Sequence, residues 1–294
     1  MFEEFKHAFS RPNYAHVQLI LINVIVFLGL LIIDLVTWIA GAESVFQAIY
    51  RQFSIPSGYS EFFSRPWTLI TYMFTHSMRD IFHILFNMLV LYWFGRLFVE
   101  YLGGDKLIAL YILGGLTGGV AYLLLYNLSP EFFGRAEMVG ASGAIYAVVV
   151  ATAVLLPNYT FYLLFFGPVR IKYIALFYII ISVIYVRHGV NIGGNIAHLG
   201  GALIGFIYMK QLQAGVNWGS WITETIQWFR DLFKPRPKVK VSYRSKSETR
   251  QRHPETADRV PQEEIDAILD KISEGGYDSL TREEKEKLFR ASRK

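Results

Sequence analysis

The sequence contains no cysteine. Disulfides and thiolate zinc sites are therefore excluded, although a chain without cysteine fits either an oxidising or a reducing compartment. Charge is also scarce: Asp, Glu, Lys and Arg make up 18% of the residues, against roughly a quarter in soluble domains. Most of that charge follows position 210, so the first part of the chain is poorer in charge still. This composition is typical of a polytopic membrane protein with a soluble tail.

The part of the chain that is poor in charge consists of long apolar runs, and hydrophobic residues make up 53% of the whole chain. A run of about 20 such residues forms a helix long enough to cross a bilayer. We predict an all-α membrane protein, a bundle of six transmembrane helices over residues 17–33, 81–101, 107–125, 142–156, 171–186 and 192–210. Asp34 marks the expected far end of the first run. No short apolar stretch with a small-residue cleavage site precedes that run, so we expect the first span to be kept in the mature protein.

The fourth run is shorter than a bilayer requires, because it stops before Pro157. A short helix with a glycine-rich approach is expected to start below the membrane surface, at the floor of a cavity. The connection over residues 35–79 is interrupted by proline and glycine but rich in aromatic side chains. We therefore predict that it lies half immersed in the membrane interface rather than spanning it.

The remaining segments differ in composition from the apolar domain. We predict a cytoplasmic N-terminal segment over 1–16, the six-helix domain over 17–212, an interfacial amphipathic helix over 213–233, a basic flexible linker over 234–261 and a small cytoplasmic helical hairpin over 262–294. In the last segment isoleucine and leucine recur at helical spacing. Thr281 and Glu284 there form a capping box, which marks the start of the second helix.

Positive charge gives the expected orientation. Lysine and arginine gather chiefly in the tail, which an inside N-terminus would make cytoplasmic, whereas both sets of connections carry arginine. The positive-inside rule therefore favours a multi-pass membrane protein with both termini in the cytoplasm. The formal net charge of +5 has two open interpretations, an anionic membrane surface nearby or simple solvation of the tail. Nucleic acid is not an expected partner.

A glycine-framed serine stands at the head of the fourth run. Gly140, Ser142 and Gly143 lie in the sequence Met-Val-Gly-Ala-Ser-Gly-Ala-Ile-Tyr. A serine hydroxyl is a poor nucleophile unless a base lies beside it. The candidate base is His198, which opens the last run. Gly201 and Gly205 follow it at helical spacing, so we expect His198 to stand above a glycine strip on which another helix packs closely.

The second run supplies polar residues at the same expected level. His83 and Asn87, at positions i and i+4, point from one face of a helix. Together with the Ser142 backbone N–H at a helix start they are candidates to stabilise an oxyanion. Gly143 would let another backbone approach there. Since no acidic residue obviously orients His198, we predict a dyad rather than a triad.

Each of these signals also has a purely structural explanation. A membrane serine usually bonds to the preceding turn of its own helix, and a lone histidine more often packs between helices. Polar groups in a bilayer are costly, however, and four of them converging on one level favour a functional site.

Three motifs together resemble the rhomboid intramembrane serine proteases of bacterial type. They are His83-Ile84-Leu85-Phe86-Asn87, Gly140-Ala141-Ser142-Gly143 and Ala197-His198-Leu199-Gly200-Gly201 with Gly205. The resemblance covers roughly residues 15–210 and implies a six-helix bundle with Ser142 as nucleophile and His198 as base. It further implies an oxyanion hole made by His83, Asn87 and the Ser142 amide, and a Tyr146 ring that stacks on the histidine.

The resemblance also implies a substrate class and shows one departure. Substrates of the family are transmembrane segments with small or helix-breaking residues near the outer face. Similar proteins often carry Trp-Arg in the first loop, whereas here Trp67 is followed by Thr68 and Arg65 lies on its other side. How this loop is anchored is therefore an open question. The C-terminal hairpin lies outside the shared core, and we hypothesise that it docks an unknown cytoplasmic partner.

The leading functional hypothesis is an intramembrane serine endopeptidase that cleaves transmembrane segments near the outer face by a Ser142–His198 dyad, without a metal or cofactor. The alternative is a non-catalytic rhomboid-like protein that binds or escorts membrane helices. A third interpretation takes His76, His83 and His198 as zinc ligands of a metalloprotease, although the sequence contains no H-E-x-x-H motif.

Overall fold

The computed structural model describes residues 14–128, 134–163, 166–232 and 261–292. The chain divides into two units, Met1–Pro235 and Arg236–Lys294, and each is described by itself. The predicted N-terminal segment 1–16 and the predicted linker 234–261 lie almost entirely outside the described residues.

The first unit is mostly helical, which confirms the predicted class, and it has a helix at each of the six predicted runs. These are α2 (Ala15–Ile39), α6 (Ile81–Leu102), α7 (Gly104–Leu128), α9 (Ser142–Leu155), α10 (Ile171–Arg187) and α11 (Ile192–Gln213). Four of them, α2, α6, α7 and α11, are long and apolar enough to cross a membrane. The other two have 14 and 17 residues.

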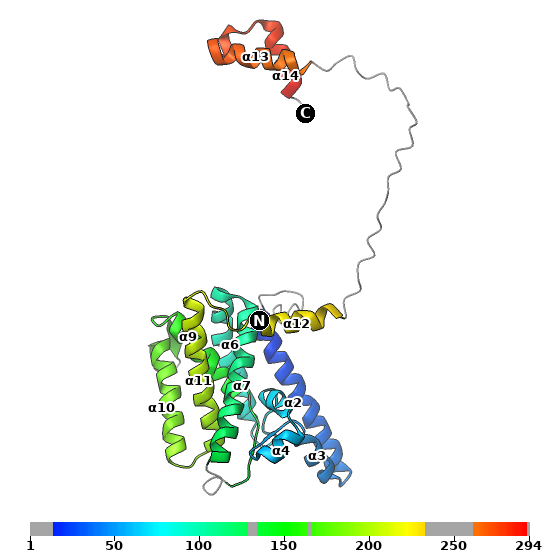
Figure 1. Cartoon of the computed structure of the whole chain (residues 1–294), viewed down its shortest axis with the longest axis vertical. Coiled ribbons are helices and arrows are strands. Elements are labelled where there is room, and N and C mark those ends of the chain that lie inside the picture. Colours follow the sequence, from blue (N-terminus) through cyan, green and yellow to red (C-terminus); the bar gives the residue numbers. More distant parts are fainter. Residues whose placement is uncertain (1–13, 129–133, 164–165, 233–260, 293–294) are drawn as a thin grey trace, which may run out of the picture. The chain divides into compact units, whose positions relative to one another are not determined.

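Helix α9 lies inside the bundle, in contact with α6, α7, α10 and α11. Every residue from Gly143 to Ala153 is buried, because protein covers the helix on all sides. Small residues make the packing close. A Cβ at Gly114 of α7 would meet Ala147 and Ala144 of α9, at 2.5 Å and 3.0 Å. The outer helix α2 packs along α6 and α7 (Figure 1).

Asp34, the predicted far end of the first span, lies inside helix α2, and the end of the span itself stays a prediction. Helix α2 continues to Ile39, where the chain turns at Gly41 with φ +64°. One partly exposed carboxylate does not end a helix, since its backbone hydrogen bonds are unaffected. The left-handed glycine, which cannot continue the helix, does.

The connection between α2 and α6 contains no spanning helix, as predicted, but it is more ordered than a loop. Its elements are α3 (Glu43–Tyr50), β1 (Ile55–Pro56), α4 (Tyr59–Ser64), α5 (Thr68–Thr71) and the 3₁₀ helix η2 (Tyr72–Phe74). Strand β1 pairs antiparallel with β2 (Glu137–Met138), so that Ile55 faces Met138 and Pro56 faces Glu137. The sequence pattern did not predict this pairing, which joins the connection to the segment that leads into α9.

Two side chains answer the question of how the connection is anchored. The Trp67 indole N–H donates to the Gln52 carbonyl oxygen at 3.0 Å. The Arg65 guanidinium donates to the Arg51 carbonyl and lies 3.7 Å from the Glu137 carboxylate. The anchoring arginine thus lies two residues before Trp67, rather than directly after it as in similar proteins.

A second unpredicted hairpin joins α9 to α10. Strand β3 (Thr160–Leu163) pairs antiparallel with β4 (Gly167–Arg170), with Thr160 opposite Arg170. Pro157 follows the end of α9, and a β-branched and aromatic stretch then continues as strand.

The helix predicted over 213–233 starts later than expected. Helix α12 (Ser220–Leu232) is preceded by a turn at Gly215, which has φ +85°. The Asn217 side-chain oxygen accepts from the Gly219 N–H at 3.1 Å, and Gly219 packs on Ala109 of α7. These turn residues separate α12 from α11.

The second unit contains α13 (Gln262–Gly275), the 3₁₀ helix η3 (Tyr277–Ser279) and α14 (Arg282–Ser292). The predicted capping box is confirmed: the Thr281 N–H donates to Glu284 at 2.7 Å, and the Glu284 N–H donates to the Thr281 hydroxyl at 3.3 Å. Ion pairs from Lys271 to Glu284 and from Lys287 to Glu264 link the two helices.

Candidate functional site

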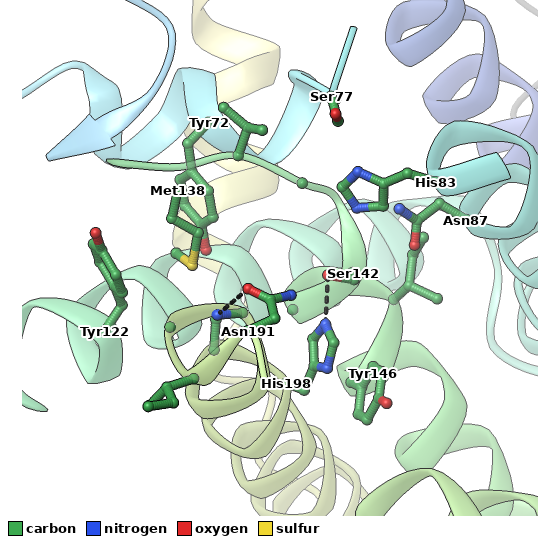
Figure 2. Close-up of a pocket in the computed structure, with 18 of the residues that line it drawn as sticks. Tyr72, Ser77, His83, Asn87, Tyr122, Met138, Ser142, Tyr146, Asn191 and His198 are labelled. Atoms are coloured by element: carbon green, nitrogen blue, oxygen red, sulfur yellow. Dashed lines mark hydrogen bonds between the residues drawn. The ribbon is translucent and has the colours of Figure 1, made fainter. Parts of the chain in front are cut away.

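A cavity of about 910 Å³ lies where α6, α9 and α11 begin. His83 and Asn87 line it from α6. Ser142, the first residue of α9, and His198, in the second turn of α11, line it as well. Figure 2 shows His83 and Asn87 on one side of Ser142, with His198 and Tyr146 on the other. The structure therefore brings together the polar residues that the sequence placed at the starts of three separate runs.

The Ser142 hydroxyl and the His198 imidazole are in direct contact. Ser142 Oγ lies 2.7 Å from His198 Nε2 (Figure 2). This is the distance of a good hydrogen bond, within the reach that proton transfer to a base requires.

Gly140 and the chain before Ser142 fix the serine in position. Gly140 has φ +140°, a conformation that favours glycine, and its N–H donates to the Tyr72 carbonyl oxygen at 3.0 Å. A Cβ at Gly140 would lie 3.1 Å from the His83 ring and 3.5 Å from Ser142 Oγ. The absence of a side chain thus lets His83 and Ser142 approach the same stretch of backbone.

The glycine strip on α11 sets the height of His198 against α9. A Cβ at Gly201 would overlap the Gly143 carbonyl, and a Cβ at Gly205 would overlap the Ala147 carbonyl. Close backbone contact of this kind requires glycine on at least one helix. One turn before Gly201, His198 is thereby held beside the serine.

Asn87 presents an unused donor to the cavity. The residue is 9% exposed, and its side-chain amide nitrogen has no hydrogen-bond partner among the residues that the structure describes. A buried donor without a partner is costly. Helix α6 is started one turn before His83 by Asp80, whose carboxylate accepts from the Phe82 N–H at 3.0 Å.

The sequence analysis missed two residues at this cavity, Ser182 and Asn191. Ser182 of α10 lies 3.3 Å from His198 Nδ1 and donates to the Tyr146 hydroxyl at 3.0 Å. A lone serine in an otherwise apolar run was the available signal. Asn191, the N-cap of α11, lines the cavity with φ 42°, and its side-chain oxygen accepts from the Gly194 N–H (Figure 2).

His76 lies close to the cavity, between η2 and α6. It is 0% exposed, with its ring centroid 5.3 Å from that of His83. Burial, and secondarily the charge of His83, lowers the pKa of His76 to about 3, so its side chain is neutral at physiological pH. Within the described ranges, no three histidine or acidic side chains form a group that could hold a metal ion, so the proposed zinc set of His76, His83 and His198 has no geometric support.

Comparison with known families matches the Rhomboid domain over residues 64–213. A family of unknown function (DUF6576) matches residues 258–294. The first match covers the helices that line the cavity, and the second covers the C-terminal helices.

Three relatives have similar sequences over about half of this chain. RHOMBOID-like protein 12, mitochondrial, of Arabidopsis thaliana is 37% identical over 160 residues, and RHOMBOID-like protein 1 of the same plant is 32% identical over 158. Rhomboid protease GlpG of Haemophilus influenzae is 31% identical over 150 residues, which cover 51% of this chain and 71% of that protein. The matched regions span only 47% and 36% of the two plant proteins.

Proposed function

Because the chain belongs to the rhomboid family, we propose that it is an intramembrane serine endopeptidase that cleaves transmembrane segments of other membrane proteins. Its apolar helices and its Rhomboid domain make it a multi-pass integral membrane protein. The observation that carries the proposal is the 2.7 Å contact between Ser142 Oγ and His198 Nε2, in a cavity lined by further polar groups.

In the proposed reaction Ser142 Oγ attacks the carbonyl carbon of the scissile peptide while its proton passes to His198 Nε2. The C–N bond then breaks, and the same imidazole gives that proton to the departing amine. Water attacks the resulting ester with His198 again as base, which releases the acid and restores the serine. The cavity supplies room for the water and for an unwound substrate segment.

His83, Asn87 and the Ser142 amide are the proposed donors to the oxyanion. The first N–H groups of a helix have no acceptor within it, and the helix dipole favours negative charge there. The unpartnered amide nitrogen of Asn87 supports its role, since a substrate oxyanion would give it an acceptor. Removing one such donor typically costs about 10²- to 10³-fold in rate.

The proposal extends to place and substrate. Cleavage would occur near the outer face, in segments with small or helix-breaking residues, because an intact helix shields its own peptide bonds. The proposed location is a bacterial inner membrane, as the resemblance to bacterial-type rhomboids implies, with both termini in the cytoplasm, which the basic tail favours.

The decisive experiment incubates the purified full chain with a labelled transmembrane peptide in liposomes. Cleavage is expected with the wild-type protein and is abolished in Ser142→Ala and in His198→Ala. The exposed residues Ser64 and His188 offer matched controls, since Ser64→Ala and His188→Ala change the same residue types away from the cavity. Undiminished cleavage by either site variant would refute the mechanism. A wild-type protein that neither cleaves nor reacts at Ser142 with a fluorophosphonate would instead indicate a non-catalytic relative that binds membrane helices.

We propose, separately, that the C-terminal helical unit docks a cytoplasmic partner. The charged pairs between α13 and α14 support a small stable unit with its own surface. Deletion of residues 236–294 is expected to remove a partner in affinity capture while cleavage of the model peptide persists. Unchanged binding partners and abundance after the deletion would contradict this role.

A further inference from the structure

Helix α10 carries one buried hydroxyl in an otherwise apolar setting. The buried residues of α10 are Ile171, Ala175 and Ser182, and Ser182 is 0% exposed. Large apolar side chains cover its other faces, among them Phe177 and Val183. A buried hydroxyl is costly unless its hydrogen bonds are satisfied, so the partners of Ser182 indicate what it does.

Both partners of Ser182 belong to the candidate site. Its Oγ lies 3.0 Å from the Tyr146 hydroxyl, to which it donates, and 3.3 Å from His198 Nδ1. Ser182 has only one hydroxyl proton. In the arrangement in which that proton goes to Tyr146, Ser182 is the acceptor and Nδ1 the donor in the contact with His198.

This direction determines the other ring nitrogen. A neutral imidazole carries one proton, so a protonated Nδ1 leaves Nε2 with a free lone pair. Nε2 is the atom 2.7 Å from Ser142 Oγ, where a base needs that lone pair. The hydrogen bonds therefore run in one direction, from Ser142 to His198, from His198 to Ser182 and from Ser182 to Tyr146.

We infer that Ser182 is a positioning residue that holds His198 in the tautomer able to accept the Ser142 proton, an inference that rests on the proposed function. Ser182 thereby takes the orienting role for which the sequence offered no acid. After proton transfer both ring nitrogens are donors, and Nδ1 keeps its acceptor in Ser182 Oγ. A neutral hydroxyl also avoids placing a carboxylate among the apolar helices, where an ionised group is expensive.

The kinetic test compares Ser182→Ala with the wild-type full chain on the labelled peptide. Because Ser182→Ala removes one neutral hydrogen bond to His198, we expect kcat to fall about tenfold and KM to change less than about twofold. The matched control is Thr152→Val, which removes a 0% exposed hydroxyl that donates to the Val148 carbonyl of its own helix. This control is expected to keep the wild-type kcat.

A double-mutant cycle tests the hydrogen-bonded chain. Tyr146→Phe keeps the stacked ring but removes the acceptor of the Ser182 proton, which frees that proton to turn toward His198. It should lower kcat by a few-fold, and the double variant should be no slower than Ser182→Ala alone. Additive losses would overturn the inference, because independent packing defects add.

The tautomer itself can be observed by ¹⁵N NMR of histidine-labelled protein, with the His198 signals assigned by their loss in His198→Gln. The wild-type signals should report Nδ1–H, and Ser182→Ala should move the population toward Nε2–H, while Thr152→Val leaves it unchanged. An identical tautomer in the wild type and Ser182→Ala would overturn the inference. This readout needs no turnover, so it decides the role of Ser182 even if absence of cleavage refutes the proposed function.

Discussion

The ring of Tyr146 lies almost parallel to that of His198, with centroids 4.2 Å apart and planes inclined by 12°. Tyr146 follows Ser142 by four residues, so one face of α9 presents the serine and, a turn below, a platform for the imidazole. The stacking implied by the family resemblance is thus present in the geometry. Since the tyrosine is buried, the ring restricts how His198 can turn.

Removing this platform should slow cleavage more than removing its hydroxyl. Tyr146→Ala is expected to reduce kcat by more than Tyr146→Phe, because an aromatic pair contributes about 0.5–1.5 kcal/mol beyond its buried area. The two variants are compared by kcat and by thermal midpoint in detergent. Equal activities of the two variants would show that stacking does not hold the histidine.

The glycine contact between α9 and α11 predicts a sharp loss of stability. Gly201→Ala inserts a methyl group where the Gly143 carbonyl lies, and such overpacking typically costs about 1–3 kcal/mol. Gly29→Ala in α2 is the matched control, because a Cβ there meets nothing within 4 Å. We expect a lower thermal midpoint and weaker cleavage only for Gly201→Ala. Similar midpoints for both variants would contradict the close approach.

Glu137 joins the connection before α6 to the segment before Ser142. Its carboxylate accepts from the Ser54 hydroxyl at 2.8 Å and lies 3.7 Å from Arg65. Glu137→Ala should therefore cost about 1 kcal/mol, mainly for the lost hydrogen bond. Glu137→Gln, which can keep an acceptor for Ser54, should cost less, and Arg51→Ala almost nothing, since the Arg51 side chain is 63% exposed. The thermal midpoint should therefore drop most in Glu137→Ala, less in Glu137→Gln and least in Arg51→Ala. A larger drop in Arg51→Ala than in Glu137→Gln would show that the ion pair is the main anchor.

His76 predicts a loss of stability in mild acid. Its pKa is 6.5 in a free side chain and about 3 in the folded protein, because burial disfavours the charged ring. Below pH 6.5 the unfolded state therefore binds a proton that the folded state does not. The stabilisation is complete above pH 6.5 and declines as pH falls toward 3.

The measurement is the thermal midpoint between pH 7.5 and 4.5, for the wild type and for His76→Phe. Other groups titrate in both proteins, so the difference between the two curves isolates His76. The variant should show the shallower decline. Parallel curves would mean that His76 ionises in the folded state as readily as in water.

Asn191 combines a left-handed backbone with a helix cap. Asn191→Ala loses the acceptor for the Gly194 N–H and forces alanine to φ 42°, so it should cost about 0.5–2 kcal/mol. Asn191→Gly tolerates the same backbone conformation and should cost only about a few tenths of a kcal/mol. Denaturation midpoints of the two variants test the order. An alanine variant as stable as the glycine variant would show that α11 begins without help from this residue.

The site could be largely anticipated from the sequence because its residues lie at helix starts. Ser142, His198, His83 and Asn87 each open an apolar run, and alternate runs of a bundle begin at the same end. Ser182 lies in mid-helix, and its contact with His198 depends on which face α10 turns toward α9. The packing of α10 against its neighbours sets that rotation, and the local sequence pattern does not predict it.

The strands were missed for a related reason. The pairing of Ile55 with Met138 joins residues far apart in sequence, and two-residue strands leave no periodicity to detect. The end of helix α2 was not readable from Asp34, because the left-handed backbone at Gly41 sets it.

The enclosure of α9 by other helices separates Ser142 from the lipid. Fourteen residues rise about 21 Å, less than the roughly 30 Å of hydrocarbon, and protein rather than acyl chains surrounds them. Thinning or thickening the bilayer would therefore shift a substrate helix relative to Ser142 while leaving Ser142 where its neighbours hold it. Because Ser142 would keep its depth while the substrate helix shifts, the peptide bond that is cleaved would move along the substrate as acyl-chain length changes.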